Sequence, residues 1–135
     1  MNLNPYIMFS GQAEEALNFY AEVLDGKIQH ISRYGEAPME VPDNYKDKIM
    51  HASMTIEGNH LMLSDSFPGN EVTSGNNVHL SLDFNDTGKL DSVFARLAEG
   101  GNVTMPVDNT FWGARFGMLT DKFGINWMFN CELKK

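Results

Sequence analysis

The sequence of 135 residues predicts an α+β protein built from two copies of one strand-helix-strand-strand-strand module. Two amphipathic helical segments stand out, and strand-like stretches surround each of them in the same order. Residues also recur at a constant interval: Phe84 follows Phe9 at the spacing at which Gly101 follows Gly26. A weak internal repeat of this length is most simply a duplicated module.

Both predicted helices have apolar residues at three- and four-residue intervals, the period of an α-helix. Ser10 is expected to cap the first helix, and Gly26 to take the left-handed conformation that ends it. Asp86 is the expected N-cap of the second helix, which ends at Gly100. The apolar stripes are Ala13, Ala16, Leu17, Tyr20, Val23 and Leu24, then Leu90, Val93, Phe94, Leu97 and Ala98.

Strand-like patterns flank the two helices. They are expected at 5–9, 27–34, 49–57 and 60–65, and again at 78–84, 102–108, 114–120 and 125–131. Residues 66–77 are rich in Gly, Asn, Ser and Thr, a composition typical of a linker. The chain is therefore expected to form one domain, 1–135, with a first module at about 1–65 and a second at about 78–135.

Composition excludes several classes of partner. The formal net charge is −8, whereas nucleic acids and anionic membrane surfaces are bound through clustered Lys and Arg. No apolar run approaches the ~20 residues that a membrane span needs. Cys131 is the only cysteine, so no intramolecular disulfide is available and a reducing compartment is indicated. We expect a cytoplasmic protein with neither a nucleic-acid nor a membrane partner.

Three stretches carry a family resemblance: 5–20, the run Met50-His51-Ala52, and 110–127 with its Asp121-Lys122-Phe123-Gly124 turn and Trp127. They resemble the PhnB-like branch of the vicinal-oxygen-chelate superfamily, which includes glyoxalases, bleomycin-resistance proteins and dioxygenases. The resemblance covers essentially the whole chain. It implies eight strands in a curled mixed sheet round a cavity, helices on the outer face, and a homodimer.

The alternation of side chains along the strands predicts which of them face the cavity. On 78–84, for example, Leu80, Leu82 and Phe84 oppose Ser81 and Asp83. The predicted lining mixes large apolar and small polar side chains, as a small-molecule pocket requires, although a filled core would show the same pattern. The predicted lining is Tyr6, Met8, His51, Ser53, Met62, Ser64, His79, Ser81 and Met128, with Trp112 and Arg115 at the edge.

The resemblance also implies where a metal would bind. Metal-dependent members of the superfamily take ligands from four positions that correspond here to Asn4, Met62, His79 and Met128. Only His79 is a good ligand for a divalent metal, since catalytic zinc needs three or more His or carboxylate ligands. His51 and Asp65 lie near enough in the pattern to contribute, but we expect no metal and no other cofactor.

Individual residues each have a functional and a structural interpretation. His51 and His79 could act as acid or base near neutral pH, or only hydrogen-bond to neighbouring groups. Trp112 could stack on a flat ligand or cap the sheet. Arg115 could hold an anionic ligand group or form a salt bridge. His30, His60 and Cys131 are expected to be ordinary surface or core residues.

The segment 33–48 is longer than its counterpart in the second module. It contains Pro38 and Pro42 and charges of both signs, so it is not expected to form a buried strand. We interpret it as a mobile lid whose apolar residues settle on a ligand, or else as a solvated insertion or a dimer contact. Those apolar residues are Tyr34, Met39, Val41 and Tyr45.

Three functions remain open from the sequence. The first, which we favour, is a metal-free protein that binds a small organic molecule. The second is a metal-dependent lyase, isomerase or dioxygenase. The third is a metal-free enzyme that uses His51 or His79 as an acid or base. The ligand, and whether the protein is an enzyme, stay undefined at this stage.

Overall fold

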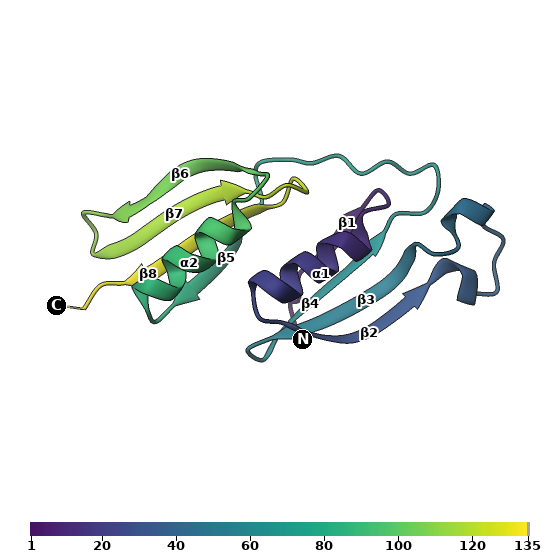
Figure 1. The fold of residues 1–135 in the computed structure, drawn as a ribbon, viewed down its shortest axis with the longest axis horizontal. Coiled ribbons are helices and arrows are strands. Elements are labelled where there is room, and N and C mark those ends of the chain that lie inside the picture. Colours follow the sequence, from purple (N-terminus) through teal and green to yellow (C-terminus); the bar gives the residue numbers. More distant parts are fainter. Residues whose placement is uncertain (135) are drawn as a thin grey trace. The chain divides into compact units, whose positions relative to one another are not determined.

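The computed structural model describes residues 1–134 and divides them into two compact units. The first is Met1–Thr73 and the second begins at Ser74, inside the segment 66–77 that the sequence marks as a linker. The amide of Val72 donates to Ser10 Oγ at 2.9 Å, so the first half of this segment remains tied to the first unit. Each unit contains one helix on one face of a sheet (Figure 1).

Unit 1 has the order strand, helix, three strands. The elements are β1 (Tyr6–Phe9), α1 (Ala13–Val23), β2 (Lys27–Arg33), β3 (Ile49–Ile56) and β4 (Asn59–Asp65), with 3₁₀ turns η1 (Tyr34–Glu36) and η2 (Asp43–Tyr45) between β2 and β3. The strands lie in the order β1-β4-β3-β2. β1 is parallel to β4 and the other neighbours are antiparallel, so the sheet is mixed.

Unit 2 repeats this arrangement. Its elements are β5 (Leu80–Phe84), α2 (Thr87–Leu97), β6 (Asn102–Asn109), β7 (Ala114–Thr120) and β8 (Asn126–Glu132). The strand order is β5-β8-β7-β6, with β5 parallel to β8. The predicted fold class, α+β with two βαβββ modules, is confirmed. The strands form two separate four-stranded sheets, one in each unit.

In each unit the helix covers one sheet face, which is where the core lies. α1 packs on β2, β3 and β4, and α2 packs on β5 and β8. The predicted alternation is seen along β1: Ile7 and Phe9 are buried, whereas Tyr6 and Met8 are half exposed. The core residues nearest the helices include Leu17, Tyr20, Ala52, Met54, Leu63, Leu90, Leu97, Leu119, Trp127 and Phe129. Within the described chain, no helix is both long and apolar enough to cross a membrane.

The start of α1 differs from the prediction. Ser10 does not cap the helix, because the N-cap position falls on Gln12; the Ser10 hydroxyl accepts from the Val72 amide instead. The carboxylate of Asp65, at the end of β4, takes that role: its Oδ1 accepts from the amides of Gly11 (2.8 Å) and Ala13 (2.9 Å). Its Oδ2 accepts from the amide of Ile49 at 2.9 Å. One buried carboxylate therefore joins the helix start to β3 and β4.

The end of α1 also differs. Asp25 has the left-handed conformation (φ 55°), and Gly26 does not. Gly26 is needed for another reason, since a Cβ there would lie 2.7 Å from the sulfur of Met54. Gly101, its match in unit 2, would likewise drive a Cβ into the backbone of Thr120 and Asp121. In α2 the predicted N-cap is confirmed, because Asp86 accepts from the amide of Lys89 at 2.8 Å.

The turn between β7 and β8 is organised by Asp121. Its Oδ1 accepts from the amides of Phe123 (2.8 Å) and Ile125 (3.1 Å), and its Oδ2 accepts from the indole of Trp127 at 2.8 Å. Asp121 is buried, so these three donors replace its hydration. The Asp-Lys-Phe-Gly turn and the following Trp, the most specific part of the family resemblance, therefore have a structural role here.

The 33–48 segment is held to unit 1 at its base. The hydroxyl of Tyr34 donates to the carbonyl of Asp65 at 2.8 Å, and that of Tyr45 donates to the carbonyl of Ser66. The two rings pack together at 5.3 Å, and burial raises the pKa of both phenols. Two of the four apolar residues expected to contact a ligand are thus used within the unit, whereas Met39 remains exposed.

An ion pair between α1 and β2 makes a small contribution to stability that depends on pH. Arg33 donates to both Glu14 oxygens at 2.9 and 2.8 Å, and this hydrogen bonding holds the pKa of Glu14 below its ordinary 4.5. The pair therefore stabilises the fold above about pH 4.5. This contribution is lost as pH falls through the lower folded-state pKa. Both side chains are partly exposed, so we expect about 0.5 kcal/mol.

Urea unfolding of wild type and Glu14→Gln between pH 3 and 7 measures this effect. The variant should be less stable only at the upper end of the range, and the two curves should converge near pH 3. A stability difference that does not change with pH would contradict the ion-pair explanation.

Candidate functional site

The face of the unit 1 sheet that α1 does not cover, which we call the open face, brings together six of the predicted site residues. Strand pairing places Tyr6 beside Met62 and Met62 beside Ser53, in one row across β1, β4 and β3. A second row begins with Met8 beside Ser64. Tyr6 and Met8 are 45% and 47% exposed, whereas Ser64 is only 4% exposed and does not reach the solvent.

Three ring side chains form an arc on this open face. The Tyr6 hydroxyl and His51 Nδ1 lie 3.1 Å apart, and the ring centroids of the two residues lie 5.7 Å apart. The ring of His30, on β2, lies 6.0 Å from that of His51. Because β4 separates β1 from β3, Tyr6 and His51 must lean toward each other over β4 to make their hydrogen bond. The arc therefore spans the whole width of the sheet.

His30 is a member of the arc that the sequence did not identify. A β-bulge between Ile28 and His30 shifts the register of β2, so that His30 pairs with Ser53 on the open face. Ser32 pairs with His51 on the same face. Simple alternation along 27–34 would put Ile28, His30 and Ser32 on one face. The bulge leaves His30 and Ser32 together and moves Ile28 to the other face, and it is visible only once β2 is paired with β3.

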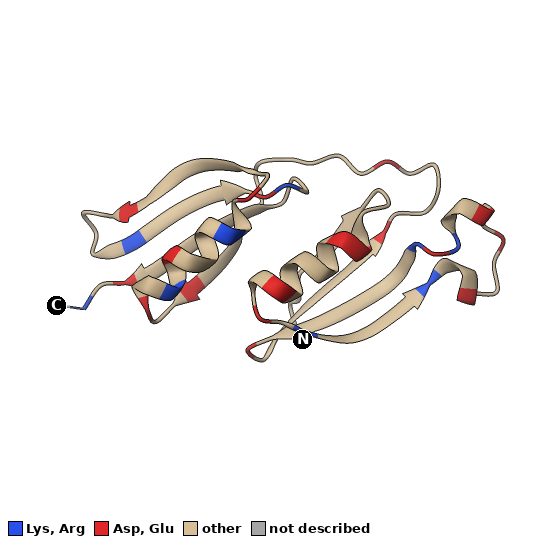
Figure 2. Ribbon diagram, in the orientation of Figure 1, with Lys and Arg blue, Asp and Glu red and all other residues tan. Residues whose placement is uncertain are grey.

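The strands of unit 1 place no carboxylate on its open face. Strands β1 and β3 contain no charged residue, and β2 has only Lys27 and Arg33, at its ends (Figure 2). Asp65 is the one acidic residue of β4, and its carboxylate is directed to the start of α1. In a chain with a formal net charge of −8, this face is unusually free of negative charge.

The open face of unit 2 has a different chemistry. Strand pairing aligns Ser81, Met128, Met118 and Met105 in one row across all four strands. The next row holds Asp83, Asn130, Phe116 and Asp108. Methionine and aromatic side chains thus occupy the middle of the face, with carboxylates at its two edges.

An aromatic cluster extends from this face to the β6–β7 turn. The Trp112 ring lies 5.9 Å from that of Phe116 and 5.1 Å from that of Phe111. Trp112 is 56% exposed and Phe111 is 97% exposed. Trp112 was predicted at the edge of the site, but Phe111 and Phe116 were not, although all three lie within one short stretch of sequence.

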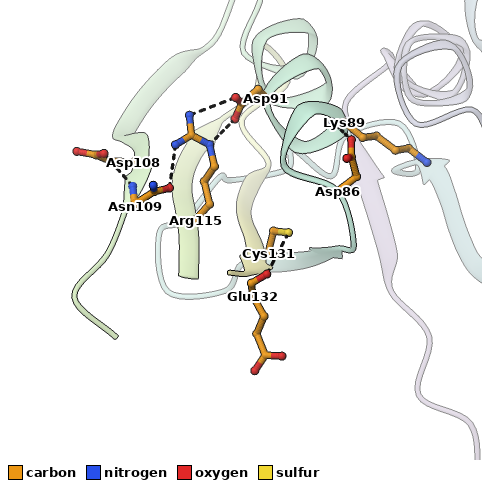
Figure 3. Close-up of polar contacts among 8 residues, drawn as sticks. All are labelled: Asp86, Lys89, Asp91, Asp108, Asn109, Arg115, Cys131 and Glu132. Atoms are coloured by element: carbon orange, nitrogen blue, oxygen red, sulfur yellow. Dashed lines mark hydrogen bonds and ion pairs between the residues drawn. The ribbon is translucent and has the colours of Figure 1, made fainter. Parts of the chain in front are cut away.

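Arg115 is not on the open face. Its guanidinium points to α2, where Nε and Nη2 donate to the two Asp91 oxygens at 2.7 and 3.2 Å and Nη1 donates to Asn109 Oδ1 at 3.0 Å (Figure 3). Asp91, which accepts from Nε and Nη2 and carries the opposite charge, raises the pKa of Arg115 above its ordinary value. Arg115 therefore forms the salt bridge that was one of its two interpretations, on the helix side of the sheet. The cause is the strand register, which places Arg115 opposite Cys131 on the helix side.

His79 lies just before β5 and not within it. Its Nε2 contacts the carbonyl of Asn76 at 3.1 Å, and its Nδ1 is buried without a hydrogen-bond partner among the described residues. Across residues 1–134, no three His, Cys, Asp or Glu side chains are grouped as a metal site. Of the four positions that correspond to metal ligands in the superfamily, only His79 offers a nitrogen ligand here, and Asp65 is committed to backbone amides.

These features define a duplicated βαβββ protein with two chemically different open faces, and comparison with known proteins identifies its family. The model of the Glyoxalase/Bleomycin resistance protein/Dioxygenase superfamily matches residues 2–129, and the chain belongs to that superfamily.

Protein YjdN of Escherichia coli K12 is 31% identical over 140 residues, which cover 96% of this chain and 95% of that protein. Among solved structures, protein PA1353 of Pseudomonas aeruginosa is 38% identical with a TM-score of 0.89, covering 99% of both chains. The PhnB protein of Bacillus cereus is 32% identical with a TM-score of 0.83, covering 97% of this chain and 99% of that one. The resemblance to PhnB-like proteins is thus confirmed.

Proposed function

We propose that this protein binds a small organic molecule on its open sheet faces, without a metal ion. The observation that carries the proposal is the arc on unit 1, where Tyr6 and His51 are held by a mutual hydrogen bond on a face that no helix of the unit covers. A ligand site needs apolar contact area with a few oriented polar groups. Met8 and Met62 supply the apolar contact area, and Tyr6, His51 and Ser53 supply the polar groups.

Unit 2 supports the same proposal with different residues. Its open face offers the thioethers of Met118 and Met128 and the exposed ring of Trp112. Methionine adapts to irregular ligand shapes, and an indole gives a large rigid contact area. Ser81 is a small polar neighbour of Met128.

A fragment screen by ligand-detected NMR tests this proposal, using small acids, amines and neutral aromatic compounds. We expect hits that bind about tenfold more weakly to His51→Ala, which loses both a polar contact and ring surface. In protein-observed spectra the same hits should shift the imidazole resonances of His51. His60→Ala is the matched control, since His60 is also on unit 1 but makes no ring contact with the arc. Hits that bind the His51→Ala variant as well as the wild type would contradict the proposed site.

A second candidate function is metal-free acid or base catalysis by His51. The specific observation in its favour is the hydrogen bond between Tyr6 and His51, because a partner of this kind orients an imidazole for proton transfer. Elemental analysis of the purified protein separates both candidates from the metal-dependent alternative. About one zinc, nickel, iron or copper per chain, lost in His79→Ala, would favour the metal-dependent enzyme.

We also propose that the chain forms a homodimer. Both sheets have exposed edge strands, β2 and β6, and both open faces carry exposed apolar side chains. Pairing with a second copy would cover such surfaces. Sedimentation at micromolar concentration is expected to give twice the chain mass of 15.2 kDa. A monomer that persists at 100 micromolar or so would contradict this expectation.

A further inference from the structure

We propose that the arc of Tyr6, His51 and His30 binds an oxyanion, the carboxylate or phosphate group of a small ligand. This inference rests on the proposed function, because it names the ligand class for the open face of unit 1. His30 was expected to be an ordinary surface residue, but the structure brings its ring to 6.0 Å from that of His51.

The electrostatic surroundings favour an anion here. The strands of unit 1 place no carboxylate on the open face. Asp65 accepts three backbone amides on the helix side, and Glu14 is paired with Arg33. An anion on this face therefore meets donors and no carboxylate from the strands of unit 1.

The other ionisable side chains that the strands place on this face, outside the arc, are the basic residues Lys27 and His60. Lys27 pairs with Thr55, and Thr55 pairs with His60, so both residues lie in the row at the far end of the face from His51. Lys27 adds positive potential at that end of the face. Arg33, at the other end of β2, is directed to Glu14 and to the carbonyl of Asp47.

The hydrogen bond between Tyr6 and His51 allows two arrangements of donors. A neutral His51 whose Nδ1 accepts from Tyr6 uses the hydroxyl proton of Tyr6 in that bond. An imidazolium at His51 instead donates from Nδ1 to Tyr6 Oη, which frees the Tyr6 O–H to donate to a ligand. The Nε2–H of His51 and an N–H of His30 complete a three-donor site.

We therefore expect the affinity for an anion to rise as the pH falls. Proton uptake by the two imidazoles and binding of an anion should be coupled, so that each strengthens the other. A neutral ligand of the same shape gains nothing from the imidazolium charge. Comparing an anion with its neutral isostere isolates the electrostatic contribution from the contact with Tyr6 and Met8.

Titration calorimetry with benzoate and benzamide at pH 5.5 and pH 8.0, and with phenyl phosphate at pH 5.5, tests the inference. We expect benzoate to bind about tenfold or more tightly at pH 5.5 than at pH 8.0, and benzamide to show no such change. Phenyl phosphate is compared with benzoate at pH 5.5 only, because a phosphate monoester itself loses a proton at about pH 6. The two anions distinguish a carboxylate ligand from a phosphate ligand. His30→Gln and His51→Gln should each remove most of the pH effect, whereas His60→Gln should leave it within about twofold.

Anion affinity that is equal at both pH values, or that survives in His30→Gln and His51→Gln, would overturn the inference. Binding of benzamide or other neutral compounds without the anions would also overturn it, but would leave the proposed small-molecule function intact. Failure of every compound to bind, here and in the wider fragment screen, would overturn both. Tyr6→Phe provides a milder variant: it should weaken anion binding at pH 5.5 while the histidine resonances show that the fold is retained.

Discussion

Replacing Asp65 by alanine is expected to lower the free energy of unfolding of unit 1 by about 3–5 kcal/mol. The carboxylate is 1% exposed and accepts from the amides of Gly11, Ala13 and Ile49. Alanine leaves those three donors without their acceptor and removes the cap of α1. Urea unfolding followed by circular dichroism, with hydrogen exchange of the α1 amides, measures the loss.

Asp43→Ala is the matched control for this prediction. Asp43 is also in unit 1, but its side chain is exposed and pairs only with Lys46 at 3.1 Å. We expect a change of less than about 0.5 kcal/mol. Asp65→Asn should fall between the two, because the amide keeps one acceptor oxygen. If Asp65→Ala is no less stable than Asp43→Ala, the capping role assigned to this carboxylate is wrong.

Replacing Asp121 by alanine is expected to cost about 3–4 kcal/mol in unit 2. The change removes the acceptor of the Phe123 and Ile125 amides and of the Trp127 indole, all at a buried position. Trp127 is the natural reporter, since its indole loses a charge-assisted hydrogen bond and its fluorescence should shift. Chemical unfolding monitored by that fluorescence gives the free energy.

Trp127→Phe and Asp108→Ala calibrate the Asp121 result. Phenylalanine removes the indole donor but keeps the two backbone hydrogen bonds, so the loss should be smaller than in Asp121→Ala. Asp108 is exposed and accepts only from the adjacent amide of Asn109, so Asp108→Ala should lie within about 0.5 kcal/mol of wild type. Equal stability of Asp121→Ala and Asp108→Ala would contradict the organising role of Asp121.

The two buried carboxylates occupy different places in the duplicated modules. Asp65 ends β4, whereas the matching position at the end of β8 is Cys131, a buried free thiol. Unit 2 caps its helix locally with Asp86 and places its buried carboxylate in the β7–β8 turn. The two modules therefore share a topology but not the polar interactions that support it.

The sequence by itself determined both helices, all eight strands to within a few residues, and the buried face of the strands. Apolar periodicity is a local property: it predicts Leu17 and Tyr20 on the covered face of α1 and Ile7 and Phe9 on the covered face of β1 without knowledge of the partner. The same alternation placed Tyr6, Met8 and His51 together on the opposite face. Two of them, Tyr6 and His51, belong to the three-residue arc proposed as the site.

Which polar groups form hydrogen bonds and ion pairs with each other was decided only by the tertiary structure. Asp65 caps a helix more than fifty residues before it in the sequence, which displaces the local candidate Ser10. A bulge in β2 brings His30 to His51, and the register of β7 turns Arg115 toward Asp91. Hydrogen bonds and ion pairs are short-ranged and directional, so they depend on strand register and chain crossing, and these are set only when the distant segments pack together.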